Sequence, residues 1–274
     1  MDKITRFGMV QGRLTQSPPG CLQWFPQETW QDEFHIASDL GINYIELIAE
    51  TQHNQNNPIW TNDGIDRIKQ LVNNNNLTLH ALCNDYIVEH TLLDEDVIQQ
   101  NIDLIEQGKK LGVEKYIMPL FDSSELTVDN MSNYINPLRR IAISARDNNI
   151  TVCLETILTG EELIELLKLI DIPYVKAVYD TGNRVAFGHN LSKDIRLLGN
   201  YIGHVHIKDK NSGNENVLLG TGLVNFEQVF YALRDINYDG PFTFETTRGS
   251  SPVETAKYNM NLVNFFKRNA ELNV

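Results

Sequence analysis

The chain contains 274 residues, 42% of them hydrophobic and 22% charged, which supplies a substantial core and excludes a wholly disordered protein. Its net charge of −13 argues against nucleic acid as a partner, because an acidic surface repels phosphodiester backbones. The odd number of cysteines, three, favours a reduced cytoplasmic protein over a disulfide scaffold, and we expect neither a signal peptide nor a membrane span.

Strand-like and helix-like segments alternate along the chain. Eight apolar runs with strand character lie near residues 7–11, 44–48, 77–83, 115–120, 150–155, 175–180, 202–208 and 242–246. Amphipathic stretches with helical spacing separate them, and glycines at Gly41 and Gly112 indicate where two of these helices end. Capping signals predict helix starts at Thr159, Asn225 and Ser251.

Eight strand signals, each followed by a helix signal, are typical of an α/β protein with a (β/α)₈ TIM barrel. The length suits one such barrel, so we predict a single domain over residues 1–274. An open doubly wound sheet is the alternative, but no glycine-rich G-x-G-x-x-G turn follows the first strand.

The last four strand-like runs end on side chains that bind metal ions. These are Glu155, Asp180, His206 and Glu245. Each shares its strand face with small or polar residues, whereas the alternate positions are apolar, so we expect all four to face the barrel interior. Active sites of TIM barrels lie at the carboxyl ends of the strands, where these residues fall.

Each of these residues also has an ordinary structural interpretation. Either glutamate could pair with an arginine or lysine at the mouth of the barrel. Asp180 could cap a helix, and His206 could be an interior histidine bonded to His204. Four such groups together favour a cation, because isolated charges inside a barrel are costly. Three carboxylates and one imidazole favour Mn²⁺ or Mg²⁺, with Co²⁺ and Zn²⁺ as further options.

Other polar residues follow or lie on the predicted strands and are candidates for substrate contacts. They are Gln11, Arg13, Glu46, Asn183, Lys208, Asp209 and Arg248, with Asn84 and Asp85 after the third strand. Backbone amides around Gly220 and Gly222 could bind an anion.

Five motifs resemble the xylose-isomerase-like sugar phosphate isomerase/epimerase family. They are G-M-V-Q-G-R-L at 8–14, L-E-T at 154–156, Y-D-T-G-N at 179–183, H-V-H-I-K-D at 204–209 and T-F-E-T at 243–246. The resemblance implies a metal-dependent barrel in which Glu155, Asp180, His206 and Glu245 bind the metal and the two glutamates are the acid/base pair. Family members include ketose 3-epimerases, hydroxypyruvate isomerase and inosose dehydratase.

The chain departs from some ketose 3-epimerases at Asn183, where they place a substrate-binding histidine three residues after the metal aspartate. It also lacks a clear counterpart of their substrate arginine. A free sugar and a phosphorylated sugar are therefore both open as the substrate.

We predict a sugar or sugar-phosphate isomerase that epimerises a ketose at C3 through a metal-stabilised enediolate, with Glu155 and Glu245 as the two acid/bases. Aldose–ketose isomerisation, dehydration of an inosose-like polyol, and a non-catalytic sugar-binding barrel are the alternatives. A related barrel endonuclease would need more histidine ligands and a basic groove. A homodimer is an expectation by analogy alone.

Overall fold

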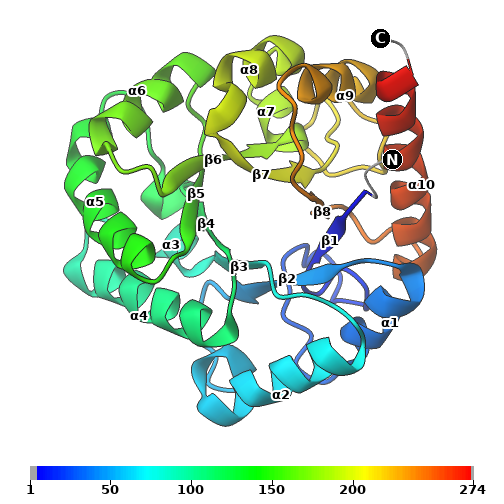
Figure 1. Cartoon of the computed structure of the whole chain (residues 1–274), viewed down its shortest axis with the longest axis horizontal. Coiled ribbons are helices and arrows are strands. Elements are labelled where there is room, and N and C mark those ends of the chain that lie inside the picture. Colours follow the sequence, from blue (N-terminus) through cyan, green and yellow to red (C-terminus); the bar gives the residue numbers. More distant parts are fainter. Residues whose placement is uncertain (1–4, 273–274) are drawn as a thin grey trace.

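The eight predicted strands are all present and pair in chain order, each parallel to the next, until the last strand closes the ring against the first. They are β1 (Phe7–Val10), β2 (Tyr44–Ala49), β3 (Ala81–Asn84), β4 (Lys115–Pro119), β5 (Thr151–Glu155), β6 (Val175–Asp180), β7 (Ile202–Ile207) and β8 (Phe242–Phe244). This computed structural model describes residues 5–272, so both ends of the predicted 1–274 domain lie outside the described part. Figure 1 shows the ring of strands inside a ring of helices, and the predicted TIM barrel is confirmed.

The helices follow the strands in the predicted alternation. They are α1 (Asp32–Leu40), α2 (Asn62–Asn74), α3 (Tyr86–Glu89), α4 (Glu95–Leu111), α5 (Met131–Asp147), α6 (Gly160–Ile170), α7 (Thr181–Ala186), α8 (Leu191–Leu198), α9 (Phe226–Asp235) and α10 (Pro252–Leu272), with 3₁₀ turns η1 (Pro58–Trp60), η2 (Asp122–Ser124) and η3 (Gly199–Tyr201). Gly41 and Gly112 end α1 and α4 with φ of 77° and 88°, a conformation that glycine adopts without strain. No helix within residues 5–272 is both long and apolar enough to cross a bilayer.

Two of the strands, β3 and β8, differ from the prediction by two residues or more at one end. β3 begins at Ala81 rather than at residue 77, because the His80 carbonyl accepts from both Glu114 N–H and Lys115 N–H at 2.9 Å and stands outside the regular ladder. β8 ends at Phe244, although the N–H of Glu245 still donates to the Ile207 carbonyl at 3.2 Å. Glu245 is therefore held against β7 although it lies beyond the regular strand.

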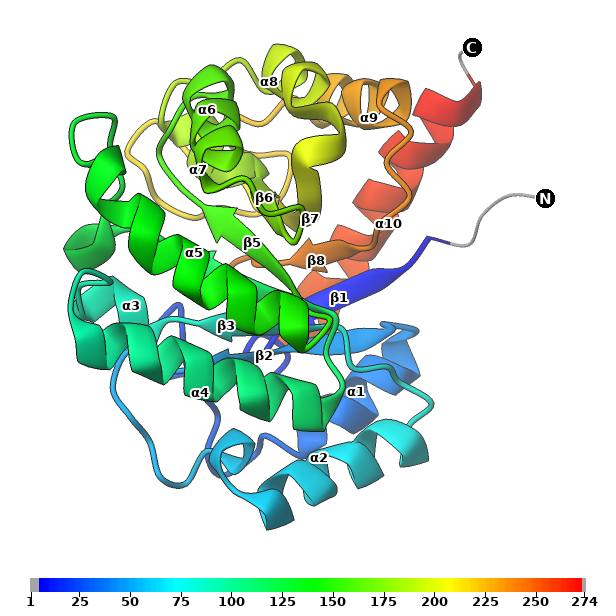
Figure 2. The same cartoon turned by 60° about the vertical axis from the view of Figure 1, so that its left-hand side comes forward.

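The apolar core lies between the strands and the surrounding helices. Figure 2 shows α4 and α5 side by side on the outside of the barrel, and the side chains of Leu104, Ile105 and Ile141 from these helices are completely buried. The strands are buried on both faces, which is usual for parallel sheets covered by helices. Because the helices pack on the outer face of the strands, the face inside the barrel can carry polar groups that bind one another.

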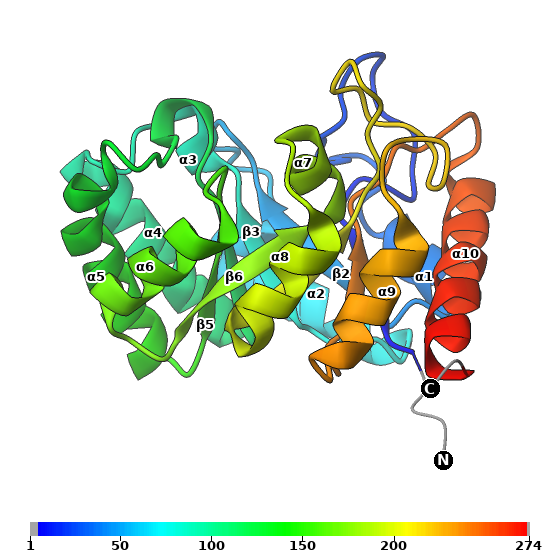
Figure 3. The same ribbon diagram turned by 90° about the horizontal axis from the view of Figure 1, so that it is seen from above.

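The long loops after β1 and β7 rise at one end of the barrel, whereas the start of β1 and the end of α10 lie at the other end (Figure 3). Because all eight strands are parallel, every strand presents its carboxyl end to this loop-bearing mouth. Residues at the ends of different strands therefore meet there.

Candidate metal centre and active site

The four predicted ligands come together at the loop-bearing mouth. Glu155 and Asp180 are the last residues of β5 and β6, His206 is the next-to-last residue of β7, and Glu245 follows β8 directly. One ligand atom of each lies within 4.8 Å of those of the others. Neighbouring parallel strands in register place these positions at similar heights in the barrel, which explains the convergence.

Asp180 combines two of the interpretations that its sequence allowed. Its Oδ1 accepts a hydrogen bond from the Asn183 N–H at 2.6 Å and caps the start of α7. Its Oδ2 is buried and has no hydrogen-bond partner within residues 5–272. A helix cap therefore fixes the carboxylate and leaves one oxygen directed at the cluster.

His206 is oriented by Glu46 rather than by His204. Its Nε2 lies 3.0 Å from Glu46 Oε1, while Nε2 of His204 lies 2.8 Å from the other oxygen of Glu46. The alternative in which the two histidines bond each other is wrong, because Nε2 of His206 bonds Glu46 and Nε2 of His204 bonds Thr243 Oγ1 at 3.0 Å. Nδ1 of His206 is left facing the cluster, where it lies 3.2 Å from Glu245 Oε2 but makes no hydrogen bond with any described residue.

Glu46, predicted as a substrate contact, therefore has both oxygens engaged by histidines. Although burial opposes ionisation, His206 and His204 lower the pKa of Glu46 to about 2. A carboxylate that binds the far nitrogen of a metal-ligating histidine fixes both the ring and its tautomer. In the sequence, this role of Glu46 was indicated by its position inside an apolar strand, because a buried carboxylate needs a cationic or hydrogen-bonding partner.

Lys208 also reaches the cluster. Its Nζ lies 2.9 Å from Glu245 Oε2 and 3.6 Å from Asp180 Oδ2. The ion pair with a lysine, which the sequence left open for the glutamates, is thus present at Glu245. The lysine leaves Asp180 Oδ2 without a hydrogen bond, so its charge only partly satisfies the cluster.

Glu155 is bound by Asn183, whose Nδ2 donates to Oε1 at 2.6 Å. Burial, with the neighbouring charges of Asp180 and Glu245, raises the pKa of Glu155 to about 8. Burial also acts to raise the pKa of Glu245, but Lys208 and His206 hold it well below its usual value. The two glutamates therefore differ in proton affinity although both belong to one cluster.

The donor set fits a divalent cation. Two buried ligand atoms, Asp180 Oδ2 and His206 Nδ1, lack hydrogen-bond partners among the described residues and belong to the same cluster. Buried polar atoms normally have a hydrogen-bond or metal partner, so this pair indicates a site for a bound ligand. Three carboxylates crowded around one lysine and one imidazole would be stabilised by additional positive charge.

A cavity of about 230 Å³ adjoins the cluster. Its lining includes Glu155, His206, Glu245, Asn183 and Lys208, with Glu46 and Asp85 also on its wall and apolar residues such as Val10 and Phe121. Asn183 and Lys208, two of the predicted substrate contacts, thus reach the space that a substrate would fill. Asp85 directly follows β3, which is the signal that singles it out in the sequence.

Arg13 lies beside the cavity rather than on its lining. Its Nη2 donates to Gln23 Oε1 at 2.6 Å and lies 3.6 Å from Glu245 Oε1. The guanidinium is buried. Arg13 thus supports Glu245 from the side away from Lys208.

Gln11 and Arg248 are engaged by the chain itself, and their predicted substrate contacts stay predictions. Gln11 Oε1 accepts from the Ile48 N–H at 3.2 Å. Arg248 donates to the carbonyls of Gly12 at 2.6 Å and of Cys21 and Leu22 at 3.0 Å, and so fastens the loop after β8 to the loop after β1. Neither residue lines the cavity beside the cluster.

Asp209 and the two glycines of the following loop differ from the prediction. Asp209 Oδ2 accepts from the N–H groups of Gly220 and Gly222 at 2.9 Å, and Oδ1 accepts from those of Lys210 and Val224 at 3.0 Å. The predicted anion site is wrong, because the protein's own carboxylate takes these amides. Asp209 closes the loop between β7 and α9 and is not on the cavity lining.

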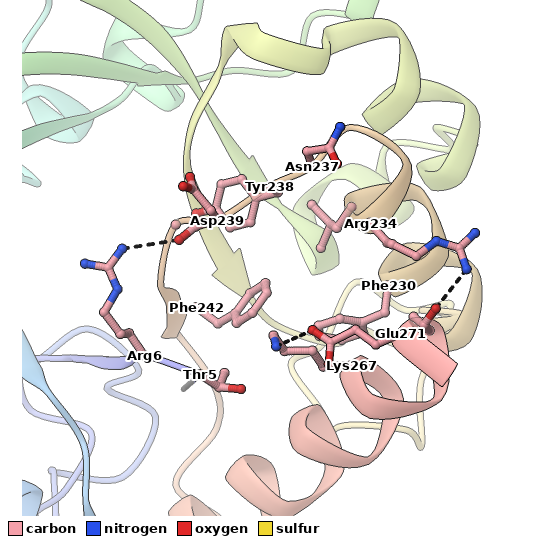
Figure 4. A pocket seen from close by; sticks show the side chains of 13 residues that line it. Thr5, Arg6, Phe230, Arg234, Asn237, Tyr238, Asp239, Phe242, Lys267 and Glu271 are labelled. Carbon is pink, nitrogen blue, oxygen red and sulfur yellow. Dashed lines mark hydrogen bonds and ion pairs between the residues drawn. The ribbon is translucent and has the colours of Figure 1, made fainter. Parts of the chain in front are cut away.

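A larger cavity of about 480 Å³ lies at the opposite end of the barrel, between the start of β1, α9 and α10 (Figure 4). Its polar groups are engaged locally: Arg6 donates to the Asp239 carbonyl at 3.3 Å, and Lys267 Nζ lies 2.6 Å from Glu271 Oε1. None of the four clustered residues lines it. Residues at this end of a TIM barrel serve stability rather than chemistry.

Comparison with known proteins assigns the chain to a family. The family model described as xylose isomerase-like TIM barrel matches residues 34–267. The chain belongs to this family. The resemblance drawn from the sequence motifs is therefore confirmed.

Several curated relatives are named as epimerases. L-ribulose 3-epimerase of Methylomonas sp. is 31% identical over 126 residues, a match that covers 43% of this chain and 43% of that protein. L-ribulose-5-phosphate 3-epimerase UlaE of Escherichia coli is 21% identical over 233 residues, covering 80% of this chain and 82% of that one. The first match is thus confined to less than half of either chain, whereas the second spans most of both.

Solved structures show the same fold. The D-psicose 3-epimerase from Clostridium cellulolyticum H10, determined with D-tagatose, superposes with a TM-score of 0.77 at 18% identity, covering 96% of this chain and 99% of that one. At this identity the likeness concerns the barrel. The named relatives and neighbours agree with the prediction of an isomerase.

Proposed function

We propose that this protein is a divalent-metal-dependent ketose 3-epimerase. The observation that carries the proposal is the cluster itself, in which Glu155 and Glu245 come from β5 and β8 with Asp180 and His206 on the strands between them. The epimerase names of relatives that match most of the chain support the reaction type.

The four clustered residues would hold the metal, with Mn²⁺ or Mg²⁺ favoured by three oxygen donors and one imidazole. A bound divalent cation supplies Lewis-acid polarisation of the substrate carbonyl. Glu46 keeps the His206 ring turned so that Nδ1 faces the cluster. Asn183 fixes the Glu155 carboxylate, and Lys208 and Arg13 do the same for Glu245.

Inversion at C3 needs one group to remove a proton from one face of the carbon and another to return a proton to the opposite face. Two carboxylates that line one cavity and come from separate strands suit this two-base reaction. In the proposal, one glutamate takes the C3 proton and the other delivers one. Both are on the lining of the 230 Å³ cavity, within reach of a small sugar.

The decisive experiment measures the uptake of deuterium from solvent into the sugar. Protein loaded with Mn²⁺ is incubated in heavy water with a panel of ketoses and ketose phosphates, and we expect deuterium at C3 together with the C3 epimer. Glu155→Gln and Glu245→Gln should each lower the exchange rate by about 100-fold or more, normalised to measured metal content. Glu165→Gln, an exposed carboxylate on α6, is the matched control and should exchange normally.

Other outcomes would contradict the proposal. Normal exchange in both glutamine variants would remove the acid/base assignment. Deuterium at C1 or C2 with an aldose product would indicate an aldose–ketose isomerase, and loss of water would indicate a dehydratase. No turnover of any ketose by metal-loaded protein would leave a sugar-binding barrel.

The remaining parts of the proposal concern the location, the partner and the oligomeric state of the enzyme. The three cysteines are unpaired and two of them are buried, which supports a reduced, cytoplasmic location. A small sugar is the proposed partner, and a homodimer stays a prediction by analogy.

A further inference from the structure

The cavity beside the cluster continues into a second one, which we call the outer cavity. The outer cavity has a volume of about 440 Å³ and shares Gln23, Thr51 and Asp85 with the cavity at the cluster. A substrate held at the cluster would therefore extend its far end past these three residues. The chemistry of this passage bears on whether that end carries a phosphate.

The passage offers no unpaired cation to a phosphate. No lysine or arginine lines the outer cavity within residues 5–272, and its charged lining residues are the carboxylates Glu50 and Asp85. In the inner cavity the one lysine on the lining, Lys208, already contacts Glu245 and Asp180. A phosphate dianion beside Glu50 and Asp85, with no lysine or arginine opposite it in the described part of the chain, would be repelled by like charge.

The two other basic groups predicted for substrate binding do not change this balance. Arg13 bonds Gln23 and lies beside Glu245, and Arg248 is engaged by three backbone carbonyls. The backbone amides that could have held an anion, those of Gly220 and Gly222, bond Asp209. Nε and Nη1 of Arg13 and Nη2 of Arg248 have no hydrogen-bond partner among the described residues, but neither arginine lines the inner or the outer cavity.

Asp85 is suited to a hydroxyl group. The residue is only 5% exposed, and its Oδ1 accepts a hydrogen bond of 3.4 Å from Cys83 Sγ. Oδ2 is buried without a hydrogen-bond partner among the described residues. Burial raises the pKa of Asp85 to about 6 against the opposing effect of hydrogen bonds from Gln23 and Cys83, so at neutral pH the ionised carboxylate can accept a further hydrogen bond. A sugar hydroxyl supplies the donor for it, whereas a phosphate dianion does not.

Neutral groups complete the outer cavity. Its lining includes Trp24, which is 37% exposed, with Gln23, Gln27, Gln52 and one histidine, His53. Aromatic rings and amides beside a carboxylate are suited to an uncharged polyol. Like charge from Glu50 and Asp85 would repel a phosphate at the same place.

We propose that the end of the substrate remote from the metal is an uncharged hydroxylated chain that hydrogen-bonds to Asp85, so that the enzyme acts on a free ketose and rejects its terminal phosphate. This inference rests on the proposed function, because it names the substrate class of the same site.

The test compares each ketose with its own terminal phosphate. Protein loaded with Mn²⁺ is assayed on ribulose and fructose and on ribulose 5-phosphate and fructose 6-phosphate. We expect kcat/KM for the free sugar to exceed that for the phosphate by about 100-fold or more, since unpaired buried polar groups discriminate strongly. With wild-type protein, kcat/KM should be about 10-fold or more lower for terminally deoxygenated ketoses than for the parent ketoses, because the deoxygenated sugars leave Asp85 without its hydrogen-bond donor.

Asp85→Asn provides the second arm. On free ketoses it should lower kcat/KM by about 10-fold, mainly through KM, and the preference for free sugar over phosphate should narrow because the negative charge is gone. It should also lose the discrimination against the deoxygenated ketoses. Asp66→Asn, an exposed position on α2, is the matched control and should behave as wild type.

Three results would overturn the inference. They are a higher kcat/KM for the phosphates, equal turnover of deoxygenated and normal ketoses by wild-type protein, or an Asp85→Asn variant with unchanged preference. Each of these leaves the proposed epimerase in place. Absence of deuterium uptake from every ketose and every phosphate would instead reject the proposed function.

Discussion

Several side chains at the mouth of the barrel have two roles. One polar atom bonds the protein, and the other faces the cluster. Asp180 caps α7 with one oxygen and directs the other at the cluster. His206 uses Nε2 on Glu46 and presents Nδ1. Because the protein bonds one atom of each residue, the other atom is held at a defined place before any ligand arrives, which reduces the cost of ordering on binding.

Lys208 is the residue whose substitution separates a metal site from an ion-pair cluster. Its amino group contacts Glu245 and Asp180 and so competes electrostatically with a cation for the same oxygens. We expect Lys208→Met to tighten Mn²⁺ binding by about 10-fold, or about 1.4 kcal/mol, in titrations of metal-free protein followed by calorimetry or by the spectrum of free Mn²⁺.

An exposed lysine provides the control. Lys168→Met, on α6, should leave the dissociation constant unchanged, because its side chain faces solvent. Weaker Mn²⁺ binding in Lys208→Met than in wild type would mean that the lysine helps to hold the metal or its ligands rather than competing. Absence of Mn²⁺ binding in both proteins would show that the cluster is a salt bridge alone.

At the scale of helices and strands, the helix that follows each strand holds the strand end in place. After β5 delivers Glu155, the chain turns and begins α6 at Thr159. Thr159 accepts from the Glu162 N–H at 3.3 Å, and Glu162 accepts from the Thr159 N–H at 2.8 Å, which is the predicted capping box. At Asn225 only the forward half of this box is present: its side chain accepts from the Gln228 N–H before α9.

Removal of this cap should be measurable. Thr159→Ala is expected to lower the free energy of unfolding by about 1 kcal/mol, because the N–H of Glu162 loses its acceptor at the start of the helix. Urea denaturation followed by circular dichroism measures the change, and Thr159→Ser should recover most of it. A loss in the alanine variant no larger than in the serine variant would show that the hydroxyl contributes nothing.

Across the whole molecule, the inward faces of the strands form a polar column rather than an apolar plug. Tyr44 Oη lies 2.5 Å from Thr243 Oγ1, and Thr243 lies 3.0 Å from Nε2 of His204, which in turn lies beside Glu46. At the lower end the His80 ring lies 5.8 Å from the ring of His204. This column joins the cluster to the opposite end of the barrel through buried groups.

The column makes stability depend on pH. Burial lowers the pKa of His80 to about 3, with His204 and Lys115 acting in the same direction, although Nδ1 of His80 lies 3.0 Å from Oε2 of the exposed Glu114. In the unfolded chain a histidine titrates near 6.5, so the unfolded state binds the extra proton first and stability falls as the pH drops below about 6.5. Between pH 7 and pH 5 this single group should cost about 2 kcal/mol of unfolding free energy.

The measurement is urea denaturation of metal-free protein at pH 7 and pH 5. His80→Gln should lose about 2 kcal/mol less than wild type over this interval, whatever its stability at pH 7. His35→Gln, at an exposed position on α1, should follow the wild-type slope. Identical slopes in wild type and His80→Gln would mean that His80 is not held neutral by the fold.

Local patterns in the sequence were enough to predict the eight strands, several helix ends and the four residues of the cluster. Alternation along a strand says which side chains face inward, and position at a strand end says which of them reach the mouth. Both are properties of a few consecutive residues, so Glu155 or His206 can be placed without any knowledge of its distant neighbours.

Only the tertiary structure decided which polar groups the protein uses for itself and which it leaves for a ligand. Glu46 meets His206 across 160 residues of sequence, and Arg248 meets Gly12 across 236. The sequence marked Asp209, Arg248 and Asp85 as similar loop charges, yet the first two are bonded to backbone and the third keeps a free oxygen in a cavity. Such pairings depend on how strands far apart in the chain close into one ring, and no local pattern encodes that distance.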